Sequence, residues 1–145
     1  MCGVIGIFDS TDVISKLYSA MLTIQHRGQD SAGMLTYDGT FHLKKGNGLI
    51  RDIFDQRNIK RLKGGVGIGH TRYPTVGEGS VEDAQPFWIN FPFGIAGAHN
   101  GNLTNFFQLK KELYEESKIL INSNCDMEVI LNVFAKYLEK FKKKK

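Results

Sequence analysis

The sequence predicts an α+β protein of one domain. The chain has 145 residues, 41% of them hydrophobic and 23% charged, which is ordinary for a globular domain that buries a core. Hairpin signals and helical periodicities occur along it without a repeat or a linker. The expected order of elements, β-α-β-β-α-β-β-β-α-α, mixes hairpins with helices, and this mixture is typical of layered α+β folds.

The first half should form a strand, a helix, a hairpin and a second helix. Residues 3–8, GVIGIF, are apolar and β-branched and predict a buried strand. Apolar residues at three- or four-residue spacing then predict a helix, with Gly28 as the stop signal beyond it. Asp38-Gly39 separates two β-prone runs and predicts a hairpin, and residues 51–62 predict a short amphipathic helix.

The second half should add three strands and two helices. Residues 64–73, GGVGIGHTRY, predict a glycine-rich strand that ends in polar groups, and residues 84–101 predict two more strands around a turn. Residues 102–117 predict a helix. A last helix carries a wide apolar face made by Val129, Ile130, Val133, Phe134, Tyr137 and Leu138. Because the chain stops soon after this face, we expect the natural domain to continue further.

Charge and cysteine content exclude several classes. The net charge of +4 equals the charge of the final lysines, residues 142–145, so the body is near neutral. We therefore expect a solvated basic tail and no nucleic-acid surface. No apolar run suggests a membrane span or a signal segment. Cys2 and Cys125 are too few for a disulfide framework or a four-cysteine metal site, and a cytoplasmic location is expected.

Polar, glycine-rich segments follow or precede the predicted strands, where sites on sheets are commonly built. They are Cys2, HRGQDSAG (26–33), HTRYPTVG (70–77), HNGNLTN (99–105) and NCDME (124–128). Each also has a purely structural interpretation. Gly28 can end a helix, Asn100-Gly101 can form a turn, Arg72 can make a surface ion pair, and Asp126 can stabilise a helix N-terminus.

Cys2 allows two interpretations. It can be a buried structural thiol at the start of a strand. If Met1 is removed, it instead carries a free α-amino group, with an unperturbed pKa of roughly 7.7–8.0, beside its thiol. One residue would then supply both a nucleophile and its general base, as in N-terminal threonine enzymes.

The downstream polar residues suit acyl transfer to such a thiol. An oxyanion needs hydrogen-bond donors, and the Asn100 amide and the Gly101 backbone N–H can provide them. Arg72 can bind an α-carboxylate in a fork, and Asp126 can pair with an α-ammonium group. Together these residues predict a site for an amino acid with a side-chain amide.

The motifs MCGVIGIF, IQHRGQDSAG, GIGHTRYPTVG, AQPF, AHNGNLTN and CDMEVILNVFA resemble those of class II (N-terminal nucleophile) glutamine amidotransferases. Within that class they are most similar to the glutaminase domain of the amidophosphoribosyltransferase family. The resemblance implies a four-layer α-β-β-α sandwich with two antiparallel sheets. Residues 1–145 would supply its N-terminal part as an incomplete type 2 glutamine amidotransferase domain, without the phosphoribosyltransferase domain.

The resemblance also implies roles for individual residues. Cys2 would be the nucleophile, Asn100 and Gly101 the oxyanion hole, and Arg72 and Asp126 the ligands of glutamine. Supporting residues would be Arg27, Gly28, Tyr73 and His99, and residues 73–82 would be a mobile loop over the substrate. The sequence departs from the family at Cys125 and Met127, where hydroxyl residues are usual, and we expect a modest change in the glutamine pocket.

The implied activity is glutamine hydrolysis through a Cys2 thioester. The ammonia would be used to make phosphoribosylamine from phosphoribosyl pyrophosphate in purine biosynthesis. We expect no metal or cofactor in this chain, since the family uses magnesium for the phosphoribosyl step in the absent domain. No iron–sulfur cluster is expected either, because the cysteines that bind one in some relatives lie in the missing part. Expected partners are glutamine, a phosphoribosyltransferase domain or polypeptide in trans, and further copies in a full-length homo-oligomer, with no nucleic acid or membrane.

Two alternatives to this function are a catalytically inert truncated fragment and the glutaminase domain of another class II amidotransferase.

Overall fold

The larger of two sheets has four antiparallel strands in the order β1-β4-β2-β3. Its strands are β1 (Gly3–Phe8), β2 (Ser31–Tyr37), β3 (Phe41–Asn47) and β4 (Val66–Arg72). The computed structural model describes residues 1–73 and 79–142. Strand β4 lies between β1 and β2, with Gly3 opposite Thr71 and Ser31 opposite Arg72. This register brings the start of β1, the end of β4 and the start of β2 to one end of the sheet.

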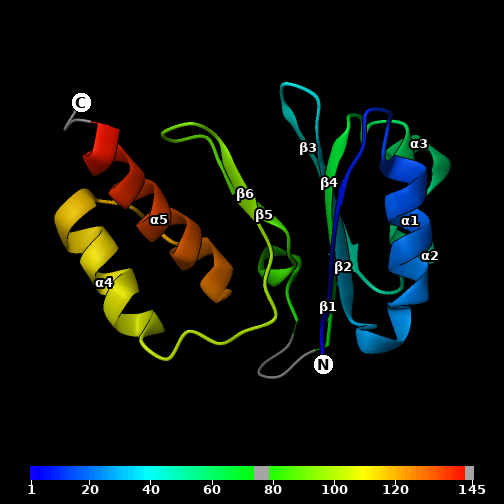
Figure 1. The fold of residues 1–145 in the computed structure, drawn as a ribbon. Helices are drawn as coiled ribbons and strands as arrows, with labels where there is room; N and C mark the ends of the chain where they lie inside the picture. Colours follow the sequence, from blue (N-terminus) through cyan, green and yellow to red (C-terminus); the bar gives the residue numbers. More distant parts are fainter. Residues whose placement is uncertain (74–78, 143–145) are drawn as a thin grey trace.

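Helices cover one face of this sheet (Figure 1). They are α1 (Ile14–Thr23), a 3-10 turn (Gln25–Arg27), α2 (Ile50–Ile53) and α3 (Gln56–Ile59). The predicted helix over 51–62 is therefore wrong in detail. It is divided because Phe54 is extended and the Asp55 side chain accepts the Asn58 N–H to start a new helix.

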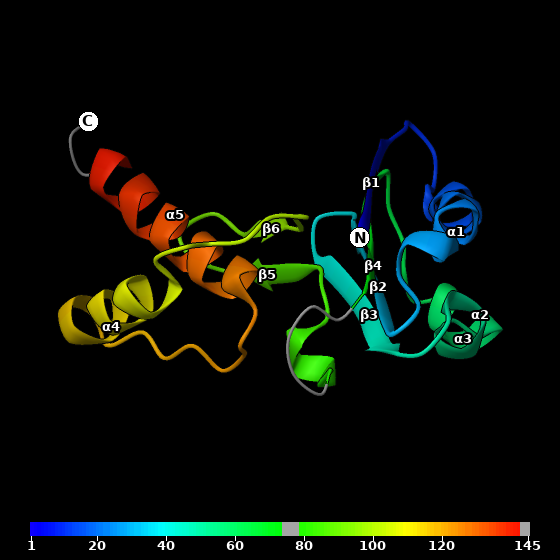
Figure 2. The same ribbon diagram turned by 90° about the horizontal axis from the view of Figure 1, so that it is seen from below.

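The second sheet contains β5 (Phe87–Ile89) and β6 (Ile95–Gly97), the antiparallel pair predicted over 84–101. Helix α5 (Asp126–Lys142) packs on it, and α4 (Phe106–Ser117) packs on α5. Helix α4 begins four residues later than predicted, because the backbone N–H of Leu103 donates to the Asp126 carboxylate. Figures 1 and 2 show the resulting layers in the order helix, sheet, sheet, helix. The predicted α+β class and α-β-β-α layering are confirmed.

The two sheets meet through side chains of β3 and β5. The rings of Phe41 and Trp88 have centroids 5.4 Å apart, and the Lys45 ammonium lies 4.1 Å from the centroid of the Phe87 ring. These contacts set the β5–β6 hairpin against the helix-free face of the larger sheet.

The apolar face predicted for the last helix is only partly covered. Val129 is fully buried between α4 and α5, whereas Phe134 and Tyr137 are 52% and 56% exposed. The residues along one edge of this face therefore pack in a core, whereas those along the other edge are exposed to solvent. Of the predicted basic tail, residues 143–145 lie outside the described residues.

Candidate active site

A cleft of about 790 Å³ opens at the end of the sandwich where the strand ends converge. Polar groups from six separate segments line it: the start of β1, the 3-10 turn, the end of β4, the segment before β5, the segment after β6 and the start of α5. Eight of the nine predicted site residues lie on its wall: Cys2, Arg27, Arg72, Tyr73, His99, Asn100, Gly101 and Asp126. The structure therefore brings together groups that are up to 124 positions apart in the chain.

Three contacts hold Cys2, which lies directly before the first residue of β1. Its Sγ lies 3.7 Å from the backbone oxygen of Tyr73. Its own carbonyl oxygen accepts hydrogen bonds from Arg27 Nε at 3.1 Å and from Asn100 Nδ2 at 3.0 Å. Cys2 is half-buried rather than a core thiol, and Met1 before it is 85% exposed. Tyr73 contributes its backbone here, since its side chain is largely exposed.

Gly28 supports the site from behind the cleft wall. A Cβ at this position would lie 2.6 Å from backbone carbons of Thr71 and Arg72. The residue therefore has to be glycine for the 3-10 turn to approach β4 so closely. Gly28 also ends the helical segment as predicted, since it is the residue that caps the 3-10 turn after α1, but it does so in an extended conformation with φ −164°.

The Asn100-Gly101 pair follows β6 and is anchored through His99. Gln85 accepts the His99 backbone N–H at 2.8 Å and donates to the His99 carbonyl at 3.2 Å. A Cβ on Gly101 would come within 2.9 Å of His99 Nδ1, so the chain passes tightly under the imidazole. These contacts hold the Asn100 side chain next to Cys2.

Arg72 is a mostly buried cation with unused donor capacity. Its side chain is 17% exposed, and its Nη1 has no hydrogen-bond partner among the described residues. The nearest carboxylate, Asp83 Oδ2, lies 3.9 Å from that nitrogen. A surface ion pair is therefore a poor description, and the free donors suit a carboxylate bound in the cleft.

Asp126 is the first residue of α5. Its Oδ1 pairs with His99 Nε2 at 2.7 Å, and its Oδ2 accepts the Leu103 backbone N–H at 2.8 Å. A carboxylate has about four acceptor positions, so capacity remains for a ligand ammonium group. The helix N-terminus stabilises its negative charge, and the structural and the ligand-binding interpretations of Asp126 are compatible.

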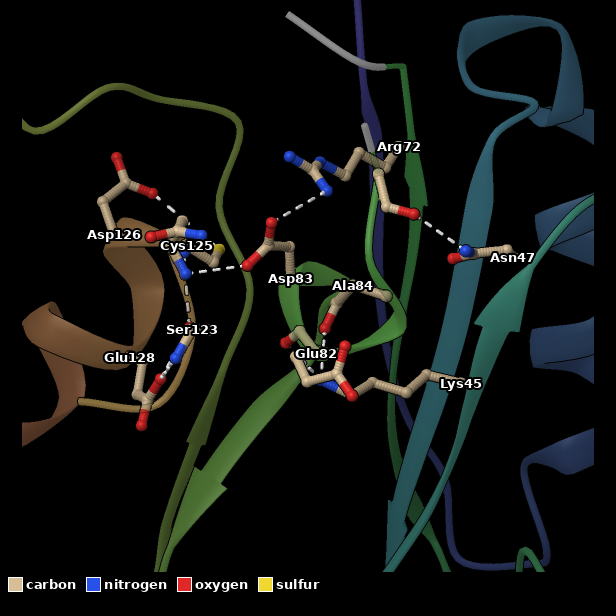
Figure 3. A network of polar contacts seen from close by, with 12 residues as sticks. Lys45, Asn47, Arg72, Glu82, Asp83, Ala84, Ser123, Cys125, Asp126 and Glu128 are labelled. Carbon is tan, nitrogen blue, oxygen red and sulfur yellow. Dashed lines mark hydrogen bonds and ion pairs between the residues drawn. The ribbon is translucent and has the colours of Figure 1, made fainter. Parts of the chain in front are cut away.

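Sequence reasoning missed Asp83, which links the two halves of the cleft (Figure 3). This buried carboxylate faces Arg72 and also accepts the Asn124 backbone N–H at 2.7 Å. Lys45 donates to the carbonyls of Glu82 and Ala84 at 3.0 and 2.7 Å, which fixes the segment around Asp83. Asp83 ends a second 3-10 turn (Val81–Asp83), and no periodicity marks a residue in so short an element, so only its place beside the AQPF motif could have indicated it.

The loop before α5 is held by another carboxylate that the sequence did not single out. Glu128 accepts the backbone N–H groups of Asn122 and Ser123 at 3.1 and 2.8 Å, and the Ser123 hydroxyl at 2.5 Å (Figure 3). These hydrogen bonds fix the loop that leads into α5, and with it the positions of Cys125 and Asp126 on the cleft wall.

The two departures from the family differ in their consequences. Cys125 lines the cleft, and burial raises the pKa of its thiol to about 11, so the group stays protonated near neutral pH. Met127 points away and packs with Leu131 in the core between α5 and the second sheet. Only the change at Cys125 therefore alters the cleft.

Three further expectations from the sequence concern a metal site, a membrane span and the loop over residues 73–82. In residues 1–73 and 79–142 no group of three or more His, Cys, Asp or Glu side chains could hold a metal ion. No helix in the described part of the chain has the length and apolarity needed to cross a bilayer. Of the loop expected over 73–82, residues 74–78 lie outside the described residues.

A four-layer α-β-β-α sandwich with its second-residue thiol in a polar cleft defines the class of N-terminal nucleophile hydrolases. Comparison with known proteins shows which members of this class the chain is similar to. The chain is 55% identical over 136 residues to the amidophosphoribosyltransferase of Pseudomonas aeruginosa, covering 93% of this chain and 27% of that protein. It is 49% identical over 144 residues to the Escherichia coli amidophosphoribosyltransferase, covering 98% and 28%.

Comparison with solved structures finds a similar fold in a protein of the same kind. The fold is similar to glutamine phosphoribosylpyrophosphate amidotransferase from B. subtilis complexed with ADP and GMP, with a TM-score of 0.79 and 33% identity over 91% of this chain and 28% of that one. No protein-family model matches the chain. The chain is thus a homologue of amidophosphoribosyltransferases and matches the N-terminal part of their sequence. It spans a little over a quarter of the length of these relatives.

Proposed function

We propose that this chain carries out the glutamine-hydrolysing half of an amidophosphoribosyltransferase reaction. The observation that supports this best is the convergence of Cys2, Asn100, Arg72 and Asp126 on one cleft. A thiol, an amide donor, a cation with free donors and a carboxylate complement glutamine group by group.

In the proposed reaction, the Cys2 thiolate attacks the side-chain amide carbon of glutamine. The α-amino group of Cys2 takes the thiol proton and passes it to the leaving nitrogen, so that the C–N bond breaks and ammonia departs. Asn100 Nδ2 and the Gly101 N–H stabilise the oxyanion. Water then attacks the thioester carbon, the C–S bond breaks, glutamate leaves and the thiol is regenerated.

This chemistry requires a processed N-terminus. With Met1 in place, the Cys2 nitrogen belongs to an amide and cannot accept a proton. Met1 is 85% exposed and Cys2 is small, which suits removal of the methionine. The carbonyl of Cys2 would stay fixed by Arg27 and Asn100, so processing need not disturb the thiol.

Arg72 and Asp126 would orient the substrate. The guanidinium binds the α-carboxylate of glutamine and the Asp126 carboxylate binds its α-ammonium group. Such clamps position the amide carbon near the thiol and discriminate against amides without an amino-acid head group.

The ammonia would serve phosphoribosylamine synthesis from phosphoribosyl pyrophosphate, in a phosphoribosyltransferase domain or polypeptide acting with this chain. Magnesium and a homo-oligomeric assembly would belong to that whole enzyme. A cytoplasmic location is proposed, since both cysteines are free and a reducing compartment keeps Cys2 as a thiol.

The test combines intact mass, activity and labelling. We expect a mass without Met1, glutamate release from glutamine, and covalent labelling of Cys2 by a diazoketone analogue of glutamine. Cys2→Ala should abolish both activity and labelling while keeping the circular dichroism spectrum. Cys125→Ala is the matched control and should still be labelled. A retained Met1, or a folded chain that is neither active nor labelled, would contradict the proposal.

A second candidate function is an inert chain that associates through exposed apolar surface. Large apolar side chains are exposed on the β5–β6 hairpin and on α5, among them Trp88, Phe91, Phe134, Tyr137 and Phe141. Such a surface favours association. Light scattering over a concentration series would detect it, and association together with absent labelling would support this candidate instead.

A further inference from the structure

His70 is a cleft residue that the proposed reaction has not used. It is the fifth residue of β4, it is only 1% exposed, and it lines the same cleft as Cys2. Its Nε2 lies 3.0 Å from Asn100 Oδ1, and Asn100 Nδ2 lies 3.0 Å from the Cys2 carbonyl oxygen. Asn100 is thus held between the buried imidazole and the backbone of Cys2.

The chemistry of these contacts determines the direction of each hydrogen bond. The Cys2 carbonyl can only accept, so Asn100 must present its NH2 group to it. The amide oxygen therefore faces His70, and because that oxygen only accepts, the proton must lie on His70 Nε2. Burial lowers the pKa of His70 to about 4, so the ring is neutral near pH 7 and Nε2 carries its single proton.

A flipped Asn100 amide would break the contact with Cys2, because the amide oxygen would meet the carbonyl oxygen of Cys2 and both can only accept. Its NH2 group would meet His70 Nε2, which can accept only if the ring proton moves to Nδ1. His70 Nδ1 is buried without a hydrogen-bond partner among the described residues, so a proton there would be unpaired and the flip is disfavoured at both ends. Asn100 itself is exposed, so packing alone does not hold its amide in one orientation.

We propose that His70 is a positioning residue, which fixes the Asn100 amide with its NH2 group toward Cys2. This rests on the proposed glutamine hydrolysis, in which that NH2 group stabilises the oxyanion. A donor that is already oriented needs no reorganisation when the oxyanion forms, and this is the main source of oxyanion-hole catalysis. His70 would act only through Asn100 and would not touch the substrate.

The kinetic test uses His70→Leu, which removes the donor, and His70→Gln, which keeps an N–H donor of similar reach. His70→Leu should lower kcat for glutamine hydrolysis about 10–100-fold and leave KM within about twofold, since misorienting an oxyanion donor costs less than the roughly 10²–10³-fold loss on removing one. The maximal rate of Cys2 alkylation by the diazoketone should fall similarly, with an unchanged half-saturating concentration. His70→Gln should recover most of both rates.

Thr36→Val is the matched control for loss of a buried polar group. Thr36 is fully buried on β2, its hydroxyl has no hydrogen-bond partner among the described residues, and it lies outside the cleft. This variant should keep both rates. An unchanged kcat in folded His70→Leu, or a loss that His70→Gln does not recover, would overturn the proposal.

A spectroscopic measurement separates this inference from the proposed function. Long-range proton–nitrogen NMR should show His70 as the neutral Nε2–H tautomer, and His70→Leu should shift the Asn100 side-chain NH2 signals. A proton on Nδ1, or unmoved Asn100 signals, would overturn the positioning role even if the wild-type chain is active. If the wild-type chain hydrolyses no glutamine, the proposed function fails, and these spectra still decide whether His70 orients Asn100.

Discussion

The two halves of the sandwich differ in how well their cores are formed. In the half built on β1–β4, one cluster joins nine buried apolar residues of the sheet, α1, α2 and the segment that leads to β4. In the half built on β5 and β6, buried residues form two separate clusters of three, one between α4 and α5 and one between α5 and the sheet. The first half is a continuous core, whereas the second depends on small, partly exposed contacts.

The candidate site lies where these halves meet. Cys2, Arg27 and Arg72 come from the well-packed half, and Asn100, Gly101 and Asp126 come from the other. The proposed nucleophile is therefore set at the end of the well-packed sheet, while the proposed oxyanion donors and one proposed ligand of the amino acid depend on the weaker half. Contacts that join the halves, such as those of His70 and Asp83, should therefore matter for activity as well as for stability.

The largest effect is expected from core truncation, compared between the halves. Leu17→Ala should lower the free energy of unfolding by about 3–5 kcal/mol, because Leu17 is fully buried against β4. Leu131→Ala, in the small cluster beside β6, should cost about 2–3 kcal/mol, since a looser surrounding can relax into the space. Urea unfolding measures both. Equal losses would show that the two cores are equally formed.

Acidification should weaken the first half through His70. Burial lowers its pKa from 6.5 to about 4, so below pH 6.5 the unfolded chain binds a proton that the native chain does not. Stability is then complete above pH 6.5 and falls as the pH decreases toward 4, by about 2 kcal/mol between pH 7 and pH 5. Unfolding curves of wild type and His70→Gln at both pH values isolate this contribution. Parallel losses in the two proteins would assign the pH dependence to other groups.

Breaking the link between the halves should have an intermediate effect. Asp83→Ala leaves the buried Arg72 cation without its nearest carboxylate and the Asn124 N–H without its acceptor, which should cost about 2–3 kcal/mol and raise KM for glutamine about tenfold. Glu82→Ala is the matched control, because Glu82 is exposed and bonds Lys45 through its backbone carbonyl. It should stay within about 0.5 kcal/mol. A KM unaffected by Asp83→Ala would separate Asp83 from substrate binding.

The smallest change in stability should come from exposed aromatic residues. Phe91→Ser, in the loop between β5 and β6, should alter the free energy of unfolding by no more than about 0.5 kcal/mol. It should nevertheless reduce association measured by light scattering, because it removes apolar surface from the less complete half. Phe8→Ser, at the exposed end of β1, serves as the comparison. If it reduces association equally, the tendency is not specific to the second half.

Local patterns were enough for most elements. The Asp38-Gly39 pair became a hairpin turn with Gly39 at φ +111°. The apolar run over 3–8 became β1, but as an edge strand with Val4 and Phe8 exposed and not as the buried strand predicted. Errors arose where a tertiary contact overrode periodicity, as at Leu103, whose N–H bonds Asp126 and delays α4. Gly28 shows the same limit, since its close approach to β4 is invisible in the local sequence.

The sequence by itself determined the element order, the thiol at the second position and the chemical types needed for an amide substrate. Residue type and spacing along the chain carry that information. Only the tertiary structure decided that eight predicted residues share one cleft, that Met127 faces a core, and that Asp83 and His70 complete the wall. The reason is the antiparallel register, which sets Gly3 beside Thr71 and Ser31 beside Arg72, together with the stacking of a second sheet that carries Asn100 to Cys2.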